Sequence, residues 1–332
     1  MPSTKTNTAP LQSFRPMNTA YNAVFTPGQL SIGLVVPIET YASSAVPQLR
    51  DHIERVQLAE SLGFSAVWLR DVPFNVPSFG DAGQVFDPFV YLGALAMQTT
   101  DIALGVASVI LPLRHPAHVA KAAATADVLS HGRLLLGIAS GDRPEEYPAL
   151  GIDFEDRRRL FRESYDYIRE MADSSPQFSS SYGRVGNGID MLPKPRAQHL
   201  PLLITGSSQQ SNEWIAVNAD GWMTYPRPAS VQRAMISDYR ERIAVACSHD
   251  KPVMEPLYID LASDPDTPPT PIHLGLRLGA HALRAYLHAR KAIGVNHIAL
   301  NLRFNQTDTP ATLAALSEHI IPYFHTEDSH DD

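Results

Sequence analysis

Eight short runs of apolar residues alternate with longer amphipathic segments, and this alternation constrains the fold more than any other feature of the chain. The runs are nearly continuous in apolar residues, as expected of strands buried on both faces. They cover residues 30–38, 66–71, 102–112, 133–141, 201–206, 221–225, 255–261 and 297–304. The amphipathic segments between them predict βα units and a parallel sheet. Eight such units predict an α/β fold, the (β/α)₈ TIM barrel. An open, doubly wound sheet of eight strands is the alternative.

The predicted barrel is a single domain that covers residues 29–325. Residues 1–28 are polar and lack the apolar core of a secretion signal. They predict an N-terminal arm that is mobile or lies on the surface or on a partner subunit, and residues 326–332 form an acidic tail. Two insertions are too long for tight turns: residues 174–200 after the fourth helix, and residues 262–279 after the seventh strand. Loops of this length are usually functional or disordered.

Composition narrows the class of partner. The chain has 332 residues and a formal net charge of −8, so it lacks the positive field of proteins that bind nucleic acid or anionic membranes. Cys247 is the only cysteine, which excludes an internal disulfide and a metal site built from several cysteines. No apolar run approaches the roughly 20 residues of a membrane-spanning helix. These features predict a cytoplasmic protein that handles small molecules, with neither nucleic acid nor membrane as a partner.

The active site of a TIM barrel lies at the carboxyl ends of its strands. Here those ends carry small and hydroxyl residues, and the several His and Asp ligands of a metal hydrolase do not converge there, so no metal site is predicted. His115 and His118 open a helix, and His115, just before a proline, is interpreted as a cap residue. Asp71, Asp142 and Asp260 leave a retaining glycosidase open, although their spacing does not favour one.

The segment "TGSSQQSNEW" (residues 205–214) is more informative about ligands. Small residues close the fifth predicted strand, and Ser208, Ser211 and Asn212 open the helix that follows. Backbone N–H groups at such a start, flanked by hydroxyls, suit a phosphate. The alternative is that Ser208 or Ser211 only caps the helix. Three consecutive arginines at 157–159 offer a cation for a phosphate, or they form a solvated face.

Residues 105–142, "GVASVILPLRHPAHVAKAAATADVLSHGRLLLGIASGD", resemble the region between the third and fourth strands of the bacterial luciferase-like monooxygenases. The shared features are a small-residue strand ending in Leu-Pro, then His-Pro, an alanine-rich helix, and Asp-x-Leu-Ser-x-Gly-Arg before a Gly-containing strand. Residues 201–222 resemble the family's fifth strand and phosphate-binding turn. The resemblance spans about residues 28–305. It is closest to a luciferase-type oxidoreductase subgroup with "WLRDVP" after strand 2 and "ASGDRP" after strand 4.

The resemblance implies a barrel that binds reduced flavin mononucleotide (FMN). Carried over by position, Gly206, Ser207, Ser208 and Ser211 would hold the flavin phosphate, and Arg158 aligns best with the cation that assists them. A 5-deazaflavin is the alternative cofactor, because its phosphate would suit the same residues.

The resemblance also places the flavin ring. Ala107 and Ser108 match the position at which the family often has a non-prolyl cis peptide bond behind the isoalloxazine. Ala139 and Ser140 match the residues of the fourth strand beside the ring. The luciferases have cysteine and arginine at these last two positions, so the expected ring environment here is less polar and lacks that cation.

The chain departs from the luciferases after the second predicted strand. They have Glu-His-His there, and the first histidine assists catalysis, whereas this chain has "DVP" at 71–73. Light emission is therefore not expected. Asp71 and Arg70 are the nearest candidate catalytic residues. The alternative is that these two side chains pair with each other at the barrel mouth.

The reaction that the resemblance implies is a flavin-dependent monooxygenation of a small organic substrate, with O₂ and with reduced FMN delivered by a separate reductase. The alternatives are a hydride-transferring, 5-deazaflavin-dependent oxidoreductase of the same fold and a flavin-binding protein without turnover. Residues 141–156 and the insertion after strand 7 are the predicted lids that exclude water. Homodimers are common among relatives, and barrel helices 2 and 3 would form the interface.

Overall fold

The computed structural model describes residues 13–324. Its barrel consists of eight parallel strands, which are β1 (Ser31–Val35), β2 (Ala66–Leu69), β3 (Ala103–Ile110), β4 (Leu134–Ala139), β7 (Leu202–Thr205), β8 (Gly221–Met223), β9 (Val253–Leu261) and β12 (His297–Asn301). Pairing runs in this order around the ring, and β12 pairs back onto β1 with Ser31 opposite His297. The predicted (β/α)₈ barrel is confirmed, and the open sheet is excluded because the ring closes.

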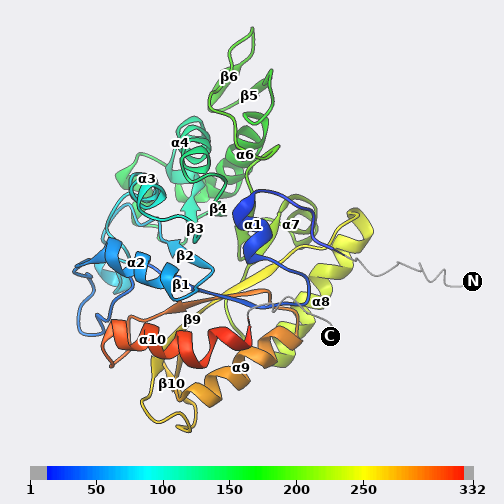
Figure 1. Cartoon of the computed structure of the whole chain (residues 1–332). Coiled ribbons are helices and arrows are strands. Elements are labelled where there is room, and N and C mark those ends of the chain that lie inside the picture. The colour runs from blue at the N-terminus through cyan, green and yellow to red at the C-terminus, as the bar shows by residue number, and fades with distance from the viewer. Residues whose placement is uncertain (1–12, 325–332) are drawn as a thin grey trace, which may run out of the picture.

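One helix follows each barrel strand and packs outside the ring (Figure 1). These are α2 (His52–Ser61), α3 (Pro88–Gln98), α4 (Pro116–Leu129), α6 (Arg157–Glu170), α7 (Asn212–Asn218), α8 (Ala229–Ala246), α9 (Ala280–Ala292) and α10 (Thr309–His319). Short helices α1 (Thr19–Val24) and α5 (Glu146–Ala149) are additional, as are single 3₁₀ turns at Pro77–Phe79, Leu111–Leu113, Phe154–Asp156 and Ile321–Tyr323. The main apolar core lies between the strands and these helices.

Side chains that point into the barrel fill it at the amino ends of the strands. Trp68 of β2 is fully buried there, and Gly105 of the neighbouring β3 leaves room for its ring. A Cβ atom at Gly105 would lie 2.2 Å from Trp68. Met223 and Met254 lie in the same cluster. The interior is therefore packed at the amino ends of the strands and opens only toward the carboxyl ends.

The described part of the predicted N-terminal arm belongs to the barrel. In α1, Tyr21 and Val24 are 2% and 1% exposed, and with Phe25 they join the cluster that fills the barrel floor. Asn18 caps α1 and donates to Asp127 Oδ1 at 2.9 Å. Residues 18–25 therefore pack against the bottom of the ring, where the apolar side chains of Tyr21, Val24 and Phe25 are buried. Residues 1–12 and the predicted acidic tail lie outside the described residues.

Both predicted insertions contain an antiparallel hairpin. The insertion after the fourth barrel helix holds β5 (Phe178–Ser180) and β6 (Gly183–Val185), which project beyond α6 at the top of Figure 1. The insertion after the seventh barrel strand holds β10 (Thr270–Ile272) and β11 (Gly275–Leu278). Because β11 pairs with the last residues of β9, the second hairpin extends the barrel wall above the point where β8 ends.

Candidate active site

A cavity of about 570 Å³ opens at the carboxyl ends of the barrel strands, where TIM barrels place their sites. Its volume lies within the range of sites for small organic ligands. Its base is apolar and its mouth carries aromatic rings. The lining residues are Val35, Arg70, Phe79, Gly80, Asp81, Ala107, Thr205, Met223, Thr224, Tyr225, Met254, Pro256, Tyr258, His273, Leu274, Ala299, Asn301, Arg303 and Phe304.

One wall of the cavity is charged. Asp81, from the connection between β2 and α3, accepts a hydrogen bond from Arg70 Nη1 at 2.8 Å through Oδ2, and the same oxygen forms an ion pair with Arg303 Nη1 at 3.0 Å. Its Oδ1 accepts from the Tyr41 hydroxyl at 3.2 Å and from the Gly83 N–H at 2.8 Å. Asp81 is thus held by three hydrogen-bond donors and one further ion pair, and it anchors two arginines at the cavity surface.

The pKa shifts in this cluster follow from burial and pairing. Burial opposes ionisation of Asp81, but Arg70 and the other donors outweigh it and lower the pKa of that carboxyl. Burial likewise opposes the charge of Arg70, and Asp81 more than offsets this, so the pKa of Arg70 is raised. Burial raises the pKa of the Tyr258 phenol, which Arg70 partly counteracts. At neutral pH the wall therefore presents two cations, one carboxylate and a neutral phenol.

Arg70 and Asp71 do not pair with each other. Asp71 accepts from Arg114 through both oxygens, with Nε–Oδ2 at 2.9 Å and Nη2–Oδ1 at 2.7 Å, and Oδ2 also accepts from the Ile110 N–H at 3.1 Å. Asp71 does not line the cavity, whereas Arg70 does. The alternation of side chains along an extended chain accounts for this difference. Of the two candidate catalytic residues, only Arg70 is placed where a substrate could touch it.

The peptide bond between Ala107 and Ser108 is cis, as the resemblance suggested. It lies where the pairing of β3 with β4 shifts register, between Val106 and Val109. Ala107 lines the cavity and Ser108 does not.

The two fourth-strand candidates lie at the end of β4 and do not line the cavity. Ala139 is half-buried at the last position of the strand. Ser140 is buried, and its carbonyl accepts a hydrogen bond from the Tyr147 hydroxyl. Ser140 thereby ties the end of β4 to α5, the short helix in the predicted lid.

The predicted phosphate turn follows Thr205, which is itself a cavity residue. The backbone curls through positive φ at Gly206, Ser208 and Gln209. Within residues 13–324, the N–H groups of Ser207 and Ser208 have no hydrogen-bond acceptor. The turn therefore offers donors to an anion, as two adjacent free N–H groups in a curled segment commonly do.

The serine hydroxyls of this turn also have structural partners. Ser211 caps α7 by accepting from the Trp214 N–H at 3.2 Å, and the Ser208 hydroxyl donates to the Thr205 carbonyl at 2.8 Å. The cap and phosphate interpretations are thus compatible, because capping occupies the hydroxyls and leaves backbone N–H groups free.

The predicted cation, Arg158, is exposed on the first turn of α6 beside this turn. Its carbonyl accepts from Gln210 Nε2 at 3.2 Å, while its guanidinium forms no hydrogen bond or ion pair with any described residue. Arg162, one turn later, is already engaged: it donates to Gln210 Oε1 at 2.7 Å and lies over the Trp214 ring at 4.1 Å. Arg158 is therefore the arginine whose charge is available to a ligand of the turn.

The predicted lid at 141–156 packs behind the mouth of the cavity. Arg143 lies 4.0 Å from the centroid of the Phe79 ring, which lines the cavity, and 3.7 Å from Glu146. Glu146 is 1% exposed, its carboxylate oxygens have no hydrogen-bond partner among the described residues, and burial raises its pKa. This segment supports the aromatic rim from outside. The other predicted lid supplies His273 and Leu274 to the cavity directly.

Sequence reasoning missed Asp81 as the centre of the charged wall. It lies in the connection between β2 and α3, away from any strand end, so no motif or spacing marks it. Arg303 follows β12 and Tyr258 lies in the carboxyl-terminal half of β9, so both could have been proposed from position alone. Their contacts with Asp81 and the cavity depend on the packing of three separate connections.

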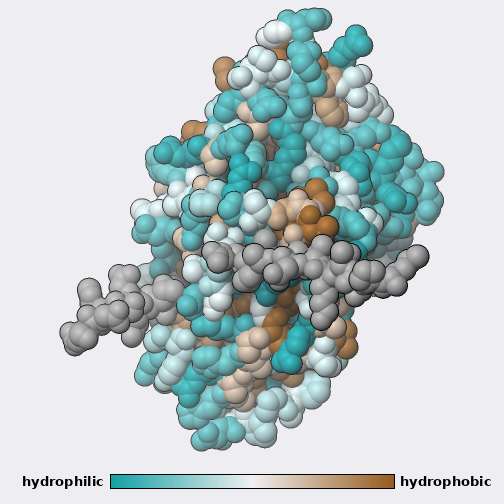
Figure 2. Space-filling view, turned by 90° about the vertical axis from the view of Figure 1, so that its right-hand side faces the viewer, coloured by the Kyte–Doolittle hydropathy of each residue, from teal (hydrophilic) through white to brown (hydrophobic). Residues whose placement is uncertain are grey.

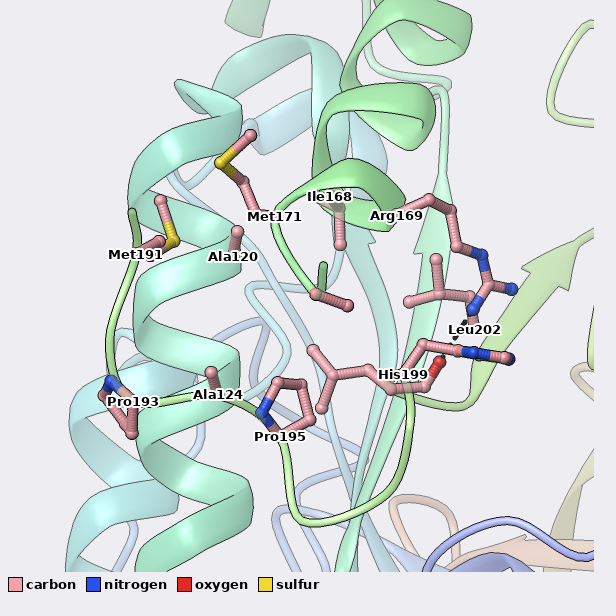
Figure 3. Close-up of a pocket in the computed structure, with 12 residues that line it drawn as sticks. Ala120, Ala124, Ile168, Arg169, Met171, Met191, Pro193, Pro195, His199 and Leu202 are labelled. Carbon is pink, nitrogen blue, oxygen red and sulfur yellow. Dashed lines mark hydrogen bonds between the residues drawn. The ribbon is translucent and has the colours of Figure 1, made fainter. Parts of the chain in front are cut away.

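A second hollow lies outside the barrel, between α4, α6 and the returning insertion (Figure 3). Ala120, Ala124, Ile168 and His199 are among its lining residues, and Arg169 at its edge donates to the Leu200 carbonyl at 2.9 Å. Its volume of about 10 Å³ corresponds to one water molecule. It is too small for a cofactor, and it lies at the amino end of β7, where Leu202 lines it, and not at the carboxyl ends of the strands.

Within the described chain, no group of three or more His, Cys, Asp and Glu residues is placed to hold a metal ion. His115 caps α4 and accepts from the Ala117 N–H at 3.2 Å.

None of the helices in residues 13–324 has the length and apolar character needed to cross a membrane. The face shown in Figure 2 is mainly hydrophilic, with hydrophobic residues gathered near its middle.

Comparison with known proteins identifies relatives of the chain. The sequence profile of the luciferase-like monooxygenases matches residues 26–258. An uncharacterised protein of Mycobacterium tuberculosis is 33% identical over 192 residues, which are 53% of this chain and 67% of that protein.

Solved structures share the architecture. An F420-dependent secondary alcohol dehydrogenase in complex with an F420-acetone adduct has a TM-score of 0.73 at 19% identity, covering 90% of this chain and 100% of the other. The oxygenating constituent of 3,6-diketocamphane monooxygenase from Pseudomonas putida, in complex with FMN, has a TM-score of 0.70 at 14% identity, covering 90% and 100%. At these identities the structures establish a common fold.

Proposed function

Because the chain belongs to the luciferase-like monooxygenase family, we propose that it is an oxidoreductase that uses reduced FMN and O₂ to oxygenate a small organic substrate. The observation that carries this proposal is the extent of the cavity, which reaches from Ala107 on β3 to Thr205 at the start of the serine turn. The cavity thus contains the expected ring position at Ala107 and ends at Thr205, the residue before the serine turn; Gly206, Ser207, Ser208, Ser211 and Arg158 are not among its lining residues.

The residues present fit an FMN phosphate. The free N–H groups of Ser207 and Ser208 would donate to its oxygens, and Arg158 would add a charge-assisted contact. Bound reduced FMN supplies the two electrons with which one atom of O₂ enters the substrate and the other leaves as water. The chain's own contribution is to bind, orient and shield the reactants: the apolar base formed by Val35, Met254 and Ala299 excludes water below them.

Arg158→Ala tests the phosphate site. We expect this change to weaken FMN binding about tenfold or more, the size of a charge-assisted hydrogen bond, measured by quenching of flavin fluorescence. Arg159→Ala is the matched control, because the neighbouring Arg159 pairs with Asp156 and Glu163 on the surface. Equal affinities of the two variants would contradict the assignment of Arg158.

Cofactor and reaction are tested with the same purified chain. It is titrated with FMN and with a 5-deazaflavin, and oxygen uptake is then followed with NADH, FMN and an added flavin reductase. Binding of FMN and substrate-stimulated oxygen uptake support the proposal. Preference for the deazaflavin would instead indicate hydride transfer; a secondary alcohol dehydrogenase of the same fold is F420-dependent. Binding without turnover would indicate a flavin-binding protein.

We further propose that the protein works in the cytoplasm beside a separate flavin reductase. The single cysteine, Cys247, is free and half-buried, as suits a reducing compartment. The proposed reaction requires reduced flavin, and a separate reductase would supply it.

A further inference from the structure

The charged wall of the cavity has one positive charge in excess. Arg70 and Arg303 line it as cations and Asp81 as the single carboxylate. Asp81 cannot neutralise both arginines, because its single negative charge is shared between them at Oδ2, which accepts from Arg70 and forms an ion pair with Arg303. A partly buried cation without its own counterion is costly unless a ligand supplies the charge.

Arg70, Arg303 and Tyr258, which all line the cavity, each keep polar side-chain atoms without a hydrogen-bond partner among the described residues. Within residues 13–324 the only side-chain partner of Arg70 is Asp81, bonded through Nη1, so Nε and Nη2 remain available. Arg303 is 8% exposed, and its Nε is buried with no hydrogen-bond partner among the described residues. The Tyr258 hydroxyl, also at the cavity, forms no hydrogen bond within the described chain.

The position of this wall separates it from the expected flavin site. Arg70 follows β2 and Arg303 follows β12, so the pair flanks β1 in the ring. The serine turn follows β7, which lies four strands from β1 in either direction around the closed ring. A flavin phosphate held by the turn is therefore across the barrel from these arginines.

We propose that this wall binds a carboxylate carried by the substrate on an aromatic or flat apolar body, and that Arg70 is the residue that selects it. The inference rests on the proposed function, because it assigns the substrate of the same cavity. A planar guanidinium matches a carboxylate with two parallel hydrogen bonds. One excess positive charge suits a monoanion, whereas a dianion would leave a buried negative charge.

The apolar body has a complementary surface. The rings of Tyr258 and Phe304 lie 5.4 Å apart between centroids, and the His273 ring lies 5.6 Å from Phe304. Phe79, backed by Arg143, completes this aromatic rim. A flat ligand can therefore stack at the mouth while its carboxylate reaches Arg70.

Titration calorimetry of the full chain, with and without FMN, tests the proposal using benzoate and its neutral isostere benzamide as probes. We expect benzoate to bind at least tenfold more tightly than benzamide, and to bind in the presence of FMN. Arg70→Gln should abolish this preference while leaving the Kd values of benzamide and FMN unchanged. Arg70→Lys, which keeps the charge, should retain part of it. Arg284→Gln is the control, since Arg284 lies over Tyr323 on the outside of the barrel.

Several outcomes would overturn the assignment. They are equal affinities for benzoate and benzamide, no benzoate binding at millimolar concentration by protein that binds FMN, or an unchanged preference in a folded Arg70→Gln. Competition between FMN and benzoate, or loss of FMN affinity in Arg70→Gln, would place the arginine against the flavin instead. A benzoate preference in a protein that binds no FMN would leave this inference standing and refute the proposed function.

Discussion

Arg70 and Asp71 show how neighbouring residues acquire separate roles from the geometry of an extended chain. Trp68 packs inside the barrel and Leu69 packs against the helices outside it. Arg70 continues the inner series and reaches the cavity, while Asp71 continues the outer series and meets Arg114. A carboxylate transfers protons more readily than a guanidinium, so chemistry alone would favour Asp71 as the catalytic residue. Its position outside the cavity, paired with Arg114, gives it a structural role instead.

Asp71→Asn should therefore lower stability and leave ligand binding intact. The change removes the carboxylate charge that Arg114 meets at 2.7 Å, in a side chain that is 1% exposed. Arg114 keeps Asp87 as a second partner at 2.8 Å, so the expected loss is about 1–3 kcal/mol, less than for an orphaned buried charge. Chemical denaturation measures the loss and fluorescence quenching measures FMN affinity. A large loss of FMN affinity at unchanged stability would assign Asp71 to the site instead.

A buried histidine makes the stability of the barrel floor depend on pH. Trp68 Nε1 donates to His297 Nε2 at 2.8 Å, and His297 Nδ1 lies 2.7 Å from the Ser31 hydroxyl, which donates to the Val24 carbonyl. Both ring nitrogens are thus used by the neutral imidazole. Burial lowers the pKa of His297 from its ordinary 6.5 to about 3.

Below pH 6.5 the unfolded chain binds a proton at His297, whereas the folded chain does not bind it until the pH approaches 3. Above pH 6.5 the imidazole is neutral in both states and does not lower the free energy of unfolding. Between pH 6.5 and 3 the free energy of unfolding falls by roughly 1.4 kcal/mol per pH unit. His297→Gln removes the titrating group, so the stability difference between wild type and variant should shrink as the pH is lowered from 7 to 5. Urea unfolding at several pH values measures this difference. A difference independent of pH would show that His297 titrates normally.

At the scale of elements, α1 is a structural part of the barrel. Phe25 is 3% exposed and its ring meets Tyr21 at 5.2 Å and His297 at 6.1 Å between centroids. Phe25→Ala should therefore cost about 3–5 kcal/mol, as for other buried aromatic truncations. Thermal and chemical denaturation measure the change. A loss below about 1 kcal/mol would indicate that the segment does not pack on the floor in solution.

The β10–β11 hairpin depends on one glycine. Gly275 pairs with Tyr258 of β9, and a Cβ atom there would lie 1.8 Å from the Tyr258 carbonyl oxygen. Gly275→Ala should detach the hairpin and remove His273 and Leu274 from the cavity. We expect faster hydrogen exchange over residues 275–278, by about tenfold or more, with the barrel strands unchanged. Gly93→Ala on α3 is the control, because nothing lies within 4 Å of its Cβ position. Unchanged exchange in Gly275→Ala would refute the dependence.

At the scale of the whole molecule, α3 presents a strip of exposed apolar side chains. Val90 and Met97 are 75% and 68% exposed and stand two helical turns apart on one face, and Leu129 at the end of α4 is 43% exposed. These are barrel helices 2 and 3, for which the resemblance implies a dimer interface. We propose that two copies associate through this strip.

The double change Val90→Glu and Met97→Glu should convert the proposed dimer to a monomer, because like charges would meet across the interface. Light scattering coupled to size exclusion measures the mass. Val245→Glu on α8 is the control, since Val245 is 84% exposed on a different helix. A monomeric wild-type protein, or a double variant that remains dimeric, would contradict the proposed interface.

The sequence by itself determined the number, order and type of the barrel elements. Each strand is buried on both faces and each helix on one, so the two patterns of hydrophobicity are local and can be read along the chain. It also located Ala107 and the serine turn, because Ala107 lies inside β3 and the turn directly follows β7.

Only the tertiary structure decided what the remaining segments do. The burial of α1 under the ring, the placing of β11 beside β9, and the charged wall joining Arg70, Asp81 and Arg303 depend on contacts between segments far apart in the chain. Ring closure brings those segments together, and no local pattern encodes it. A polar residue in a connection looks the same in sequence whether it meets water or completes a cavity.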